Sequence, residues 1–282
     1  MQPMILTSKD KTLDLSFSHA MGILNVTPDS FSDGGQFHQF DHAMRHVESM
    51  LSAGVSIIDI GGESTRPGAA DVATAEELDR VVPVIEAIRQ RFDCWISIDT
   101  SKAQVMTAAV NAGADLINDV RALQEPGALE AAAAANVPVC LMHMQGQPRT
   151  MQHQPSYENL LMDVSQFLAE RIQACEKAGI AKNQLLLDPG YGFGKTIEDN
   201  YQLLAHLEQF HQFGLPLLVG MSRKSMVFKL LDKKPAECVA GSLACAAIAA
   251  MKGAQIIRVH DVAETVDVLK VCQMTKMQMN KS

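Results

Sequence analysis

The chain alternates short apolar runs with longer helical patterns, and this alternation restricts the possible fold more than any other feature of the sequence. Eight apolar runs, rich in Ile, Val and Leu, are separated by amphipathic or alanine-rich segments with helical spacing. Strands that alternate with helices pair in parallel and are covered by those helices. The expected strands are 21–26, 56–61, 95–100, 115–120, 138–143, 184–190, 215–220 and 256–260.

Local signals at the helix ends support this division. Asp41 is expected to cap a helix that ends before Gly54, because an aspartate accepts hydrogen bonds from the first turn and a glycine tolerates the left-handed conformation after the last. Thr74 and Glu77 have the spacing of a capping box. Helices are therefore expected to begin near residues 41 and 74.

The expected architecture is α/β, with a single (β/α)8 barrel (TIM barrel) domain over residues 1–282. The composition has no break, and no long linker separates the helical segments. Residues 1–11 and 274–282 are expected to be flexible ends. A doubly wound open sheet is the alternative, because periodicity alone does not prove that the sheet closes.

The overall charge and the cysteines restrict the class of protein. Among 282 residues, 47% are hydrophobic and the net charge is −8, which argues against nucleic acid or an anionic membrane as the main partner. The six cysteines form neither C-x-x-C nor a zinc-like spacing, so reduced core thiols in a cytoplasmic protein are expected. No apolar run approaches the roughly 18 residues that a membrane-spanning helix needs.

Polar side chains stand at the carboxyl end of nearly every expected strand. In a barrel these ends converge on one face, where ligands bind. Leaving a buried polar group without a partner costs about 1–3 kcal/mol, so a complete ring of such groups indicates a polar ligand. The ring consists of Asn25, Asp59, Asp99, Asn118, His143, Asp188, Arg258 and His260, together with Ser222, Arg223 and Lys224 after Gly220.

The ring has two chemical halves. Its acceptors suit a planar edge with several N–H donors, such as an aminopyrimidine: Asp99, Asn118 and Asp188. Its cations suit phosphate or pyrophosphate: Arg66, Arg258, His260 and Lys224. Asn25 and Asp59 offer hard oxygens to Mg²⁺, which prefers few protein ligands and substrate phosphates. A flat nitrogen heterocycle that carries a diphosphate is the expected ligand.

Three segments beside the ring have unusual compositions. Loops 27–35 and 61–70 are rich in Gly, Ser, Thr, Pro and Asp and are expected to close over the reacting centre. The segment 189–196 ends in Gly-Lys-Thr like a phosphate-binding P-loop, but Pro189 occupies the position of the first glycine. We interpret it as a glycine-rich wall in which Phe193 covers a flat ligand.

Eight segments together resemble the enterobacterial-type bacterial dihydropteroate synthases, a family of pterin-binding TIM-barrel enzymes. The resemblance covers about residues 12–270, with Tyr191 where the family often has Phe. The segments are MGILNVTPDSFSDGG, IIDIGGESTRPGA, ISIDTSK, GADLINDV, LMHMQG, LLLDPGYGFGK, LVGMSRKS and IIRVHDV.

The resemblance implies a homodimeric transferase of folate biosynthesis. Such an enzyme condenses 6-hydroxymethyl-7,8-dihydropterin diphosphate with p-aminobenzoate, releases diphosphate, uses Mg²⁺ and is inhibited by sulfonamides. The expected alternatives are a pterin-dependent methyltransferase on the same barrel, or a non-catalytic pterin-binding paralogue. Arg66, Arg258 and loop 27–35 favour a diphosphate substrate.

The resemblance also implies a role for individual side chains. The pterin would contact Asp99, Asn118, Met142, Asp188, Phe193, Gly220 and Lys224. The diphosphate would contact Asn25, Thr65, Arg66, Arg258 and His260, with Asn25 as the metal ligand. The p-aminobenzoate would lie near Phe31, Thr65, Pro67, Phe193, Ser222 and Lys224. The catalytic residues would be Asp99, Lys224, Arg258 and His260.

Overall fold

Eight parallel strands form a closed ring at the centre of the structure, which is a computed structural model that describes residues 4–27, 36–64, 71–146 and 155–279. Hydrogen-bonded neighbours follow the order β8-β7-β6-β5-β4-β3-β10-β9. The strands are β3 (His19–Asn25), β4 (Ile57–Gly61), β5 (Trp95–Asp99), β6 (Leu116–Asp119), β7 (Val139–Met142), β8 (Leu185–Asp188), β9 (Leu218–Val219) and β10 (Ile256–Val259).

A contact between the first and last strands of this order closes the barrel. Leu187 of β8 forms a parallel bridge with Leu217, directly before β9. The amide of Leu187 also donates to the carbonyl of Pro216 at 2.9 Å. The predicted barrel is therefore confirmed, and the doubly wound open sheet is excluded.

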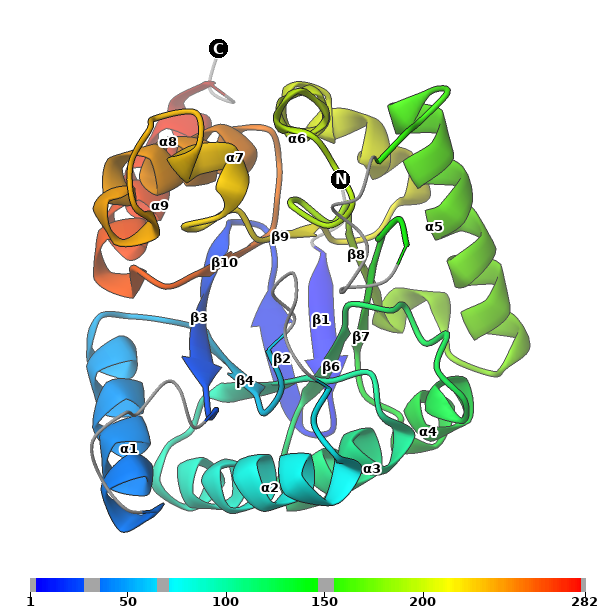
Figure 1. The fold of residues 1–282 in the computed structure, drawn as a ribbon, viewed down its shortest axis with the longest axis vertical. Helices are drawn as coiled ribbons and strands as arrows, with labels where there is room; N and C mark the ends of the chain where they lie inside the picture. The colour runs from blue at the N-terminus through cyan, green and yellow to red at the C-terminus, as the bar shows by residue number, and fades with distance from the viewer. Residues whose placement is uncertain (1–3, 28–35, 65–70, 147–154, 280–282) are drawn as a thin grey trace.

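Helices form an outer ring around the strands (Figure 1). Their apolar faces pack against the outward-pointing side chains of the strands in one large hydrophobic core. They are α1 (Gln36–Ser52), α2 (Thr74–Arg91), α3 (Ala103–Ala112), α4 (Ala128–Ala135), α5 (Leu160–Lys177), α6 (Ile197–Ala205), α7 (Ser225–Phe228), α8 (Val239–Met251) and α9 (Val262–Met279), with 3₁₀ turns η2 (Lys182–Gln184), η3 (Leu207–Phe213) and η4 (Pro235–Glu237).

Two predicted helix caps are wrong. Asp41 lies inside α1, which begins at Gln36. The N-cap residue of α2 is Ala73, and no side chain caps this end. Glu77 is instead buried and forms an ion pair with Lys102, because tertiary pairing of a buried carboxylate outweighs a local bond to an exposed backbone amide.

Eight inward side chains, one from each strand, fill the interior of the barrel toward the amino-terminal ends of the strands. This apolar layer consists of Met21, Ile57, Trp95, Leu116, Cys140, Leu186, Leu218 and Ile256. Its members lie at equivalent inward positions because side chains alternate between the two faces of a strand. The barrel is therefore solid at its amino-terminal end.

An antiparallel hairpin completes this apolar layer. Strand β1 (Ile5–Ser8) pairs with β2 (Lys11–Asp14), and Leu6 and Leu15 pack into the layer from below. The expected flexible end at 1–11 is thus corrected for its described part, because burying Leu6 offsets the entropy of ordering the segment. At the other end of the chain, α9 continues to Met279, so the described part of 274–282 is helical.

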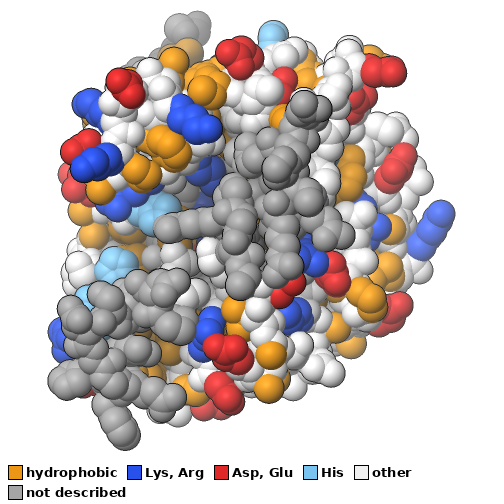
Figure 2. All heavy atoms as spheres, in the orientation of Figure 1, with side chains coloured by type: hydrophobic (Ala, Val, Ile, Leu, Met, Phe, Trp, Pro, Cys, Tyr) orange, Lys and Arg blue, Asp and Glu red, His pale blue; other side chains and the backbone are white. Residues whose placement is uncertain are grey.

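The cysteines and the surface agree with the composition. All six cysteines are unpaired and buried, as expected for core thiols. In the described part of the chain, no helix has both the length and the apolar character that crossing a bilayer requires. Figure 2 shows acidic and basic side chains interspersed over the visible face around the grey atoms.

The hairpin predicts a sharp contrast between two adjacent leucine-sized side chains. Leu6 is 1% exposed and Ile5 is 51% exposed, on opposite faces of β1. Leu6→Ala should lower the free energy of unfolding by about 2–4 kcal/mol, because it leaves a cavity below the barrel. The matched change Ile5→Ala should alter it by less than about 0.5 kcal/mol. Urea unfolding of both variants measures the contrast, and equal losses would contradict the proposed packing.

Candidate active site

The interior of the barrel changes from apolar to charged toward the carboxyl ends of the strands. Two residues beyond the apolar layer, the same inward faces carry Asp59, Ser97, Asn118, Asp188 and Arg258. Asp99 follows Ser97 on the inward face of β5. All three carboxylates in this set are buried. These polar and charged side chains occupy inward positions toward the carboxyl ends of their strands, where the barrel opens.

Arg258 lies at the centre of this charged layer. Its Nε donates to Asp59 Oδ2 at 2.6 Å, and its Nη2 donates to Asp99 Oδ2 at 2.8 Å. The amide of Asn118 donates to the same Asp59 oxygen at 3.3 Å. The guanidinium of Arg258 thereby connects β10 to β4 and β5 and holds two carboxylates in fixed orientations, and Asn118 of β6 joins through Asp59.

Asp188 and Lys224 form the second charged group. Asp188 Oδ1 accepts from the amide of Gly190 at 2.7 Å, which orients the carboxylate at the end of β8. Burial raises the pKa of Asp188, although the nearby Lys224 acts to lower it. Burial also lowers the pKa of Lys224 to about 8, against the attraction of Asp188. Lys224 therefore holds its proton less firmly than an exposed lysine does.

Three polar atoms of the interior have no hydrogen-bond partner in the described part of the chain. They are Asp59 Oδ1, Ser97 Oγ and Asp99 Oδ1. Leaving such atoms unpaired costs about 1–3 kcal/mol each, so the layer is suited to a ligand that supplies donors. Burial raises the pKa of Asp99 to about 7, even though Arg258 opposes the shift. A carboxyl group that can either donate or accept near neutral pH therefore faces the interior.

An apolar wall stands beside the buried acceptors. Met142 at the end of β7 packs with Val120 and Phe193 in a small separate cluster, against which Met144 lies. Lys224 Nζ is 4.5 Å from the centre of the Phe193 ring and donates to the carbonyl of Tyr191 at 2.7 Å. A flat ring between this wall and Asp188 would have apolar contact on its face and hydrogen-bond acceptors at its edge.

The remaining predicted residues lie at the rim. Ser222 Oγ is 3.1 Å from His260 Nδ1 and accepts from the amide of His260 at 3.2 Å. Asn25, which is half-buried, lies beside Gly61 and Asp99: a Cβ on Gly61 would lie 3.6 Å from Asn25 Oδ1. Gly220 passes close to Arg258 and Lys224. The predicted positions Phe31, Thr65, Arg66 and Pro67 lie outside the described residues.

Two members of the predicted ring turn away from the mouth of the barrel, that is, from the charged layer and its rim at the carboxyl ends of the strands. His143 follows the inward-facing Met142, so strand alternation directs its ring outward, edge-on against Phe167 at 5.0 Å between centroids. Arg223 pairs with Asp261. The inward residue at the end of β7 is therefore Met142 rather than His143, and Arg223 does not belong to the ring.

Two lysines that the sequence did not single out support the loops. Lys195 belongs to the glycine-rich segment 189–196, and its side chain is buried. Lys102 bonds both the buried Glu77 and Glu63, which precedes the undescribed residues 65–70. The sequence gives no direct signal for either role, because Lys102 pairs with Glu63 and Glu77 on other elements and Lys195 pairs with His143 after β7 as well as with its own segment.

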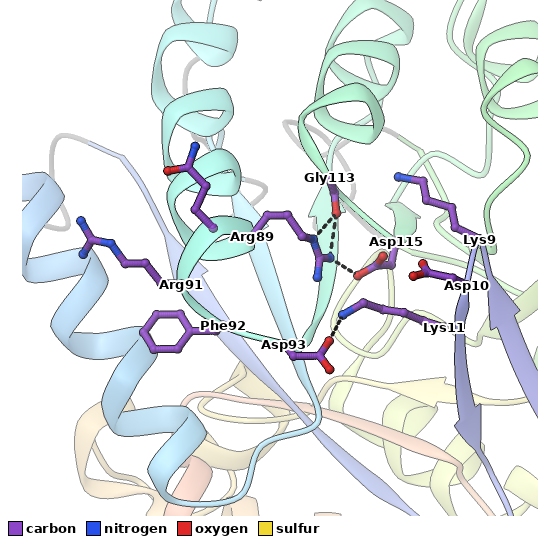
Figure 3. A pocket seen from close by; sticks show the side chains of 10 residues that line it. Lys9, Asp10, Lys11, Arg89, Arg91, Phe92, Asp93, Gly113 and Asp115 are labelled. Atoms are coloured by element: carbon purple, nitrogen blue, oxygen red, sulfur yellow. Dashed lines mark hydrogen bonds and ion pairs between the residues drawn. The ribbon is translucent and has the colours of Figure 1, made fainter.

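A different pocket, of about 500 Å³, lies near the amino-terminal end of the barrel (Figure 3). Two of its cations, Arg89 and Lys11, are paired with carboxylates of the protein itself. Arg89 bonds Asp115 and the carbonyl of Gly113, and Lys11 bonds Asp93. None of the described residues that line it has a buried side-chain polar atom without a partner, in contrast to the charged layer at the other end of the barrel.

Comparisons with known proteins agree on one family. The family described as pterin binding enzyme matches residues 21–260. Dihydropteroate synthase of Escherichia coli strain K12 is 60% identical over 272 residues, which is 96% of each chain. A Yersinia pestis dihydropteroate synthase solved with a sulfonamide drug superposes with a TM-score of 0.94 at 64% identity, covering 97% of this chain and 100% of that one. A 7,8-dihydropteroate synthase from Vibrio fischeri is 72% identical, with a TM-score of 0.88 and coverage of 98% and 99%.

The raised pKa of Asp99 predicts a pH-dependent stability. The unfolded carboxyl ionises near 3.8 and the folded one near 7, so the folded state binds the extra proton between these values. Wild-type stability should therefore lose a contribution as pH rises from about 4 to 7. Asp99→Asn lacks this titration, so its stability relative to wild type should improve over the same range and then level off.

Urea unfolding at several pH values measures this difference. Ser97→Ala is the matched control, because Ser97 is buried on the inward face of the same strand and has no titrating group. Its difference from wild type should not change with pH. A flat profile for Asp99→Asn would contradict the raised pKa.

Proposed function

This chain belongs to the pterin-binding enzyme family and, within it, to the dihydropteroate synthases, and from that premise we propose how its side chains divide the reaction. The enzyme condenses 6-hydroxymethyl-7,8-dihydropterin diphosphate with p-aminobenzoate and releases diphosphate. The chain falls with synthases rather than with pterin-dependent methyltransferases. Its substrate-binding residues are assigned below from their contacts.

The pterin lies in the charged layer, with its ring against Met142 and Phe193. The observation that carries this assignment is the group of buried polar side chains Asp99, Asn118 and Asp188 beside an apolar wall. Asp188 and Asn118 bind the N–H groups of the pyrimidine edge, and Lys224 donates to an acceptor of the ring. Asp99 faces the same interior, and its charged form favours positive charge on the dihydropterin as the diphosphate departs.

The diphosphate lies at the rim between Arg258 and His260, with the undescribed Thr65 and Arg66 on the loop after β4. Nε and Nη2 of Arg258 are occupied by carboxylates, whereas Nη1 has no hydrogen bond to a described residue. This arrangement supports donation from Nη1 to a departing phosphate. The two carboxylates hold the guanidinium in place before the substrate binds, so little reorganisation is needed when charge develops.

Asn25 is the protein ligand of Mg²⁺ in this scheme. The described residues contain no cluster of three or more His, Cys, Asp or Glu that could hold an ion. One amide oxygen near a diphosphate fits Mg²⁺, which takes one or two protein ligands and completes its shell with phosphate oxygens and water. The bound ion would supply positive charge to the leaving group.

The p-aminobenzoate lies above the pterin, near Ser222, Lys224 and Phe193, and near the undescribed Phe31, Thr65 and Pro67. The ammonium of Lys224 and the hydroxyl of Ser222 are suited to its carboxylate. Its aromatic amine is neutral at pH 7 and needs no strong base. Loops 27–35 and 61–70 exclude water that would otherwise react with the pterin carbon. A sulfonamide competes because it resembles this second substrate.

The enzyme acts as a homodimer in the cytoplasm. Exposed apolar side chains gather on two helices that pack against each other, namely Ile248 and Met251 on α8 and Val271, Met274 and Met277 on α9. Such a surface is suited to burial against a second copy. Six unpaired buried cysteines agree with a reducing compartment.

The central experiment measures diphosphate release from the pterin diphosphate. Release coupled to dihydropteroate formation should require p-aminobenzoate and should fall when Mg²⁺ is chelated. Arg258→Ala should lower turnover by roughly 10²–10³, because it removes a fixed donor to the leaving group. Arg89→Ala is the control, since Arg89 also pairs with a buried aspartate but at the opposite end of the barrel. Turnover near the wild-type rate in Arg258→Ala would remove Arg258 from this role.

A second measurement addresses the orientation of the pterin. Asp188→Asn keeps the shape of the side chain but removes its charge, so pterin affinity should fall by roughly 10- to 100-fold, the value of a charged hydrogen bond. The KM for p-aminobenzoate at saturating pterin should change little. Asp163→Asn, on the exposed face of α5, is the control. Titration calorimetry measures the pterin affinity and steady-state kinetics measure the KM; an unchanged pterin affinity would mean that the ring is oriented differently.

A further inference from the structure

The glycine-rich segment 189–196 lies directly against the backbone that follows β7. Gly190, Gly192 and Gly194 have φ angles of 75°, 80° and 64°, which residues other than glycine rarely adopt. A Cβ on Gly190 would lie 1.8 Å from the carbonyl oxygen of His143, and one on Gly194 would lie 2.5 Å from that of Gln145. The segment has no room to shift toward β7.

Lys195, which belongs to this segment, folds its side chain back onto the backbone of the segment. Its side chain is almost completely buried, and its Nζ makes hydrogen bonds to three acceptors. These are His143 Nδ1 at 2.9 Å, the carbonyl of Gly190 at 2.9 Å and the carbonyl of Phe193 at 3.1 Å. An ammonium group has three N–H donors, so the three acceptors match it fully.

His143 is present as the neutral acceptor of this arrangement. Burial, together with the charge of Lys195, lowers the pKa of His143 to about 2. Its Nδ1 therefore carries a lone pair toward Lys195, and its proton is on Nε2. Burial lowers the pKa of Lys195 to about 7, and Asp188 opposes this shift.

The two carbonyls that Lys195 holds stand next to the groups assigned to the pterin. Gly190 donates its amide to Asp188 Oδ1, so the position of Gly190 sets the orientation of that carboxylate. Phe193 forms the apolar wall with Met142. Lys195 thus links Asp188, at the edge of the pterin ring, to Phe193, on the face of the ring. It does so through the backbone and does not itself reach the substrate.

We propose that Lys195, with His143 as its acceptor, is a positioning residue that fixes Asp188 and Phe193 at the spacing that the pterin ring requires. This inference rests on the proposed placement of the pterin. Lys195 acts through the glycine-rich segment rather than by contact with substrate. Loss of the ammonium would release both carbonyls, so the edge and the face of the site would lose their relative position together.

Lys195→Met tests the inference, because methionine fills similar space without donors. The KM and the Kd for pterin diphosphate should rise about tenfold or more, while kcat should stay within about threefold. A purely structural lysine would instead reduce the fraction of folded enzyme, which lowers the apparent kcat and leaves KM unchanged. Thermal unfolding and active-site titration separate the two effects.

His143 provides a matched pair of controls. His143→Asn retains an acceptor near the Nδ1 position and should leave KM within about threefold, whereas His143→Leu should raise it nearly as far as Lys195→Met does. If Lys195→Met does not fold, the double variant Lys195→Met with His143→Leu replaces the whole polar pair by apolar groups and should fold. A raised KM for pterin diphosphate in this double variant would then support the positioning role.

The outcomes separate this inference from the assignment of function. Wild-type enzyme that forms no dihydropteroate would overturn the function itself. Active wild-type enzyme together with an unchanged pterin KM and Kd in Lys195→Met, or in the double variant, would overturn only the positioning role. Equal KM values for His143→Asn and His143→Leu would overturn the part assigned to His143.

Discussion

The ion pairs of Arg258 with two buried aspartates are the interaction on which the rest of the mouth depends. Removing charges from water is costly, and only close pairing with good hydrogen-bond geometry offsets that cost. Arg258 meets this condition with both Asp59 and Asp99. Even so, the buried carboxylates Asp59, Asp99 and Asp188 outnumber the cations Arg258 and Lys224. Burial is the main cause of the raised pKa of Asp99; the charge of Asp59 adds to the shift, and the charge of Arg258 opposes it.

The same imbalance links folding to ligand binding. A layer with unpaired acceptors is less stable than one in which all are satisfied, so part of the folding free energy has been exchanged for a site that is arranged before its ligand arrives. The apolar layer below compensates, since eight inward side chains together with Leu6 and Leu15 fill the base and bury mainly apolar surface. The apolar layer thus stabilises the barrel, and the charged layer above it forms the proposed binding site of the substrates.

Much of this organisation was predictable because it follows from periodicity. The strand ends at Asp99, Asn118 and Asp188 could be placed on one face from spacing alone, and the structure brings them there. Interactions between distant elements were not predictable. Glu77 has the spacing of a capping box but pairs with Lys102, and the hairpin with Leu6 is ordered by a barrel that only the folded chain supplies. His143 directly follows the inward-facing Met142. Consecutive side chains of a strand point to opposite faces, so His143 points outward.

The hairpin under the barrel has a consequence for the path of the reactants. Because the base is filled, solvent reaches the interior from one end only, and both reactants and both products must pass through the same opening. A pair of short strands that touches no reacting group thus helps to close the far end of the barrel, together with the eight inward side chains that fill it.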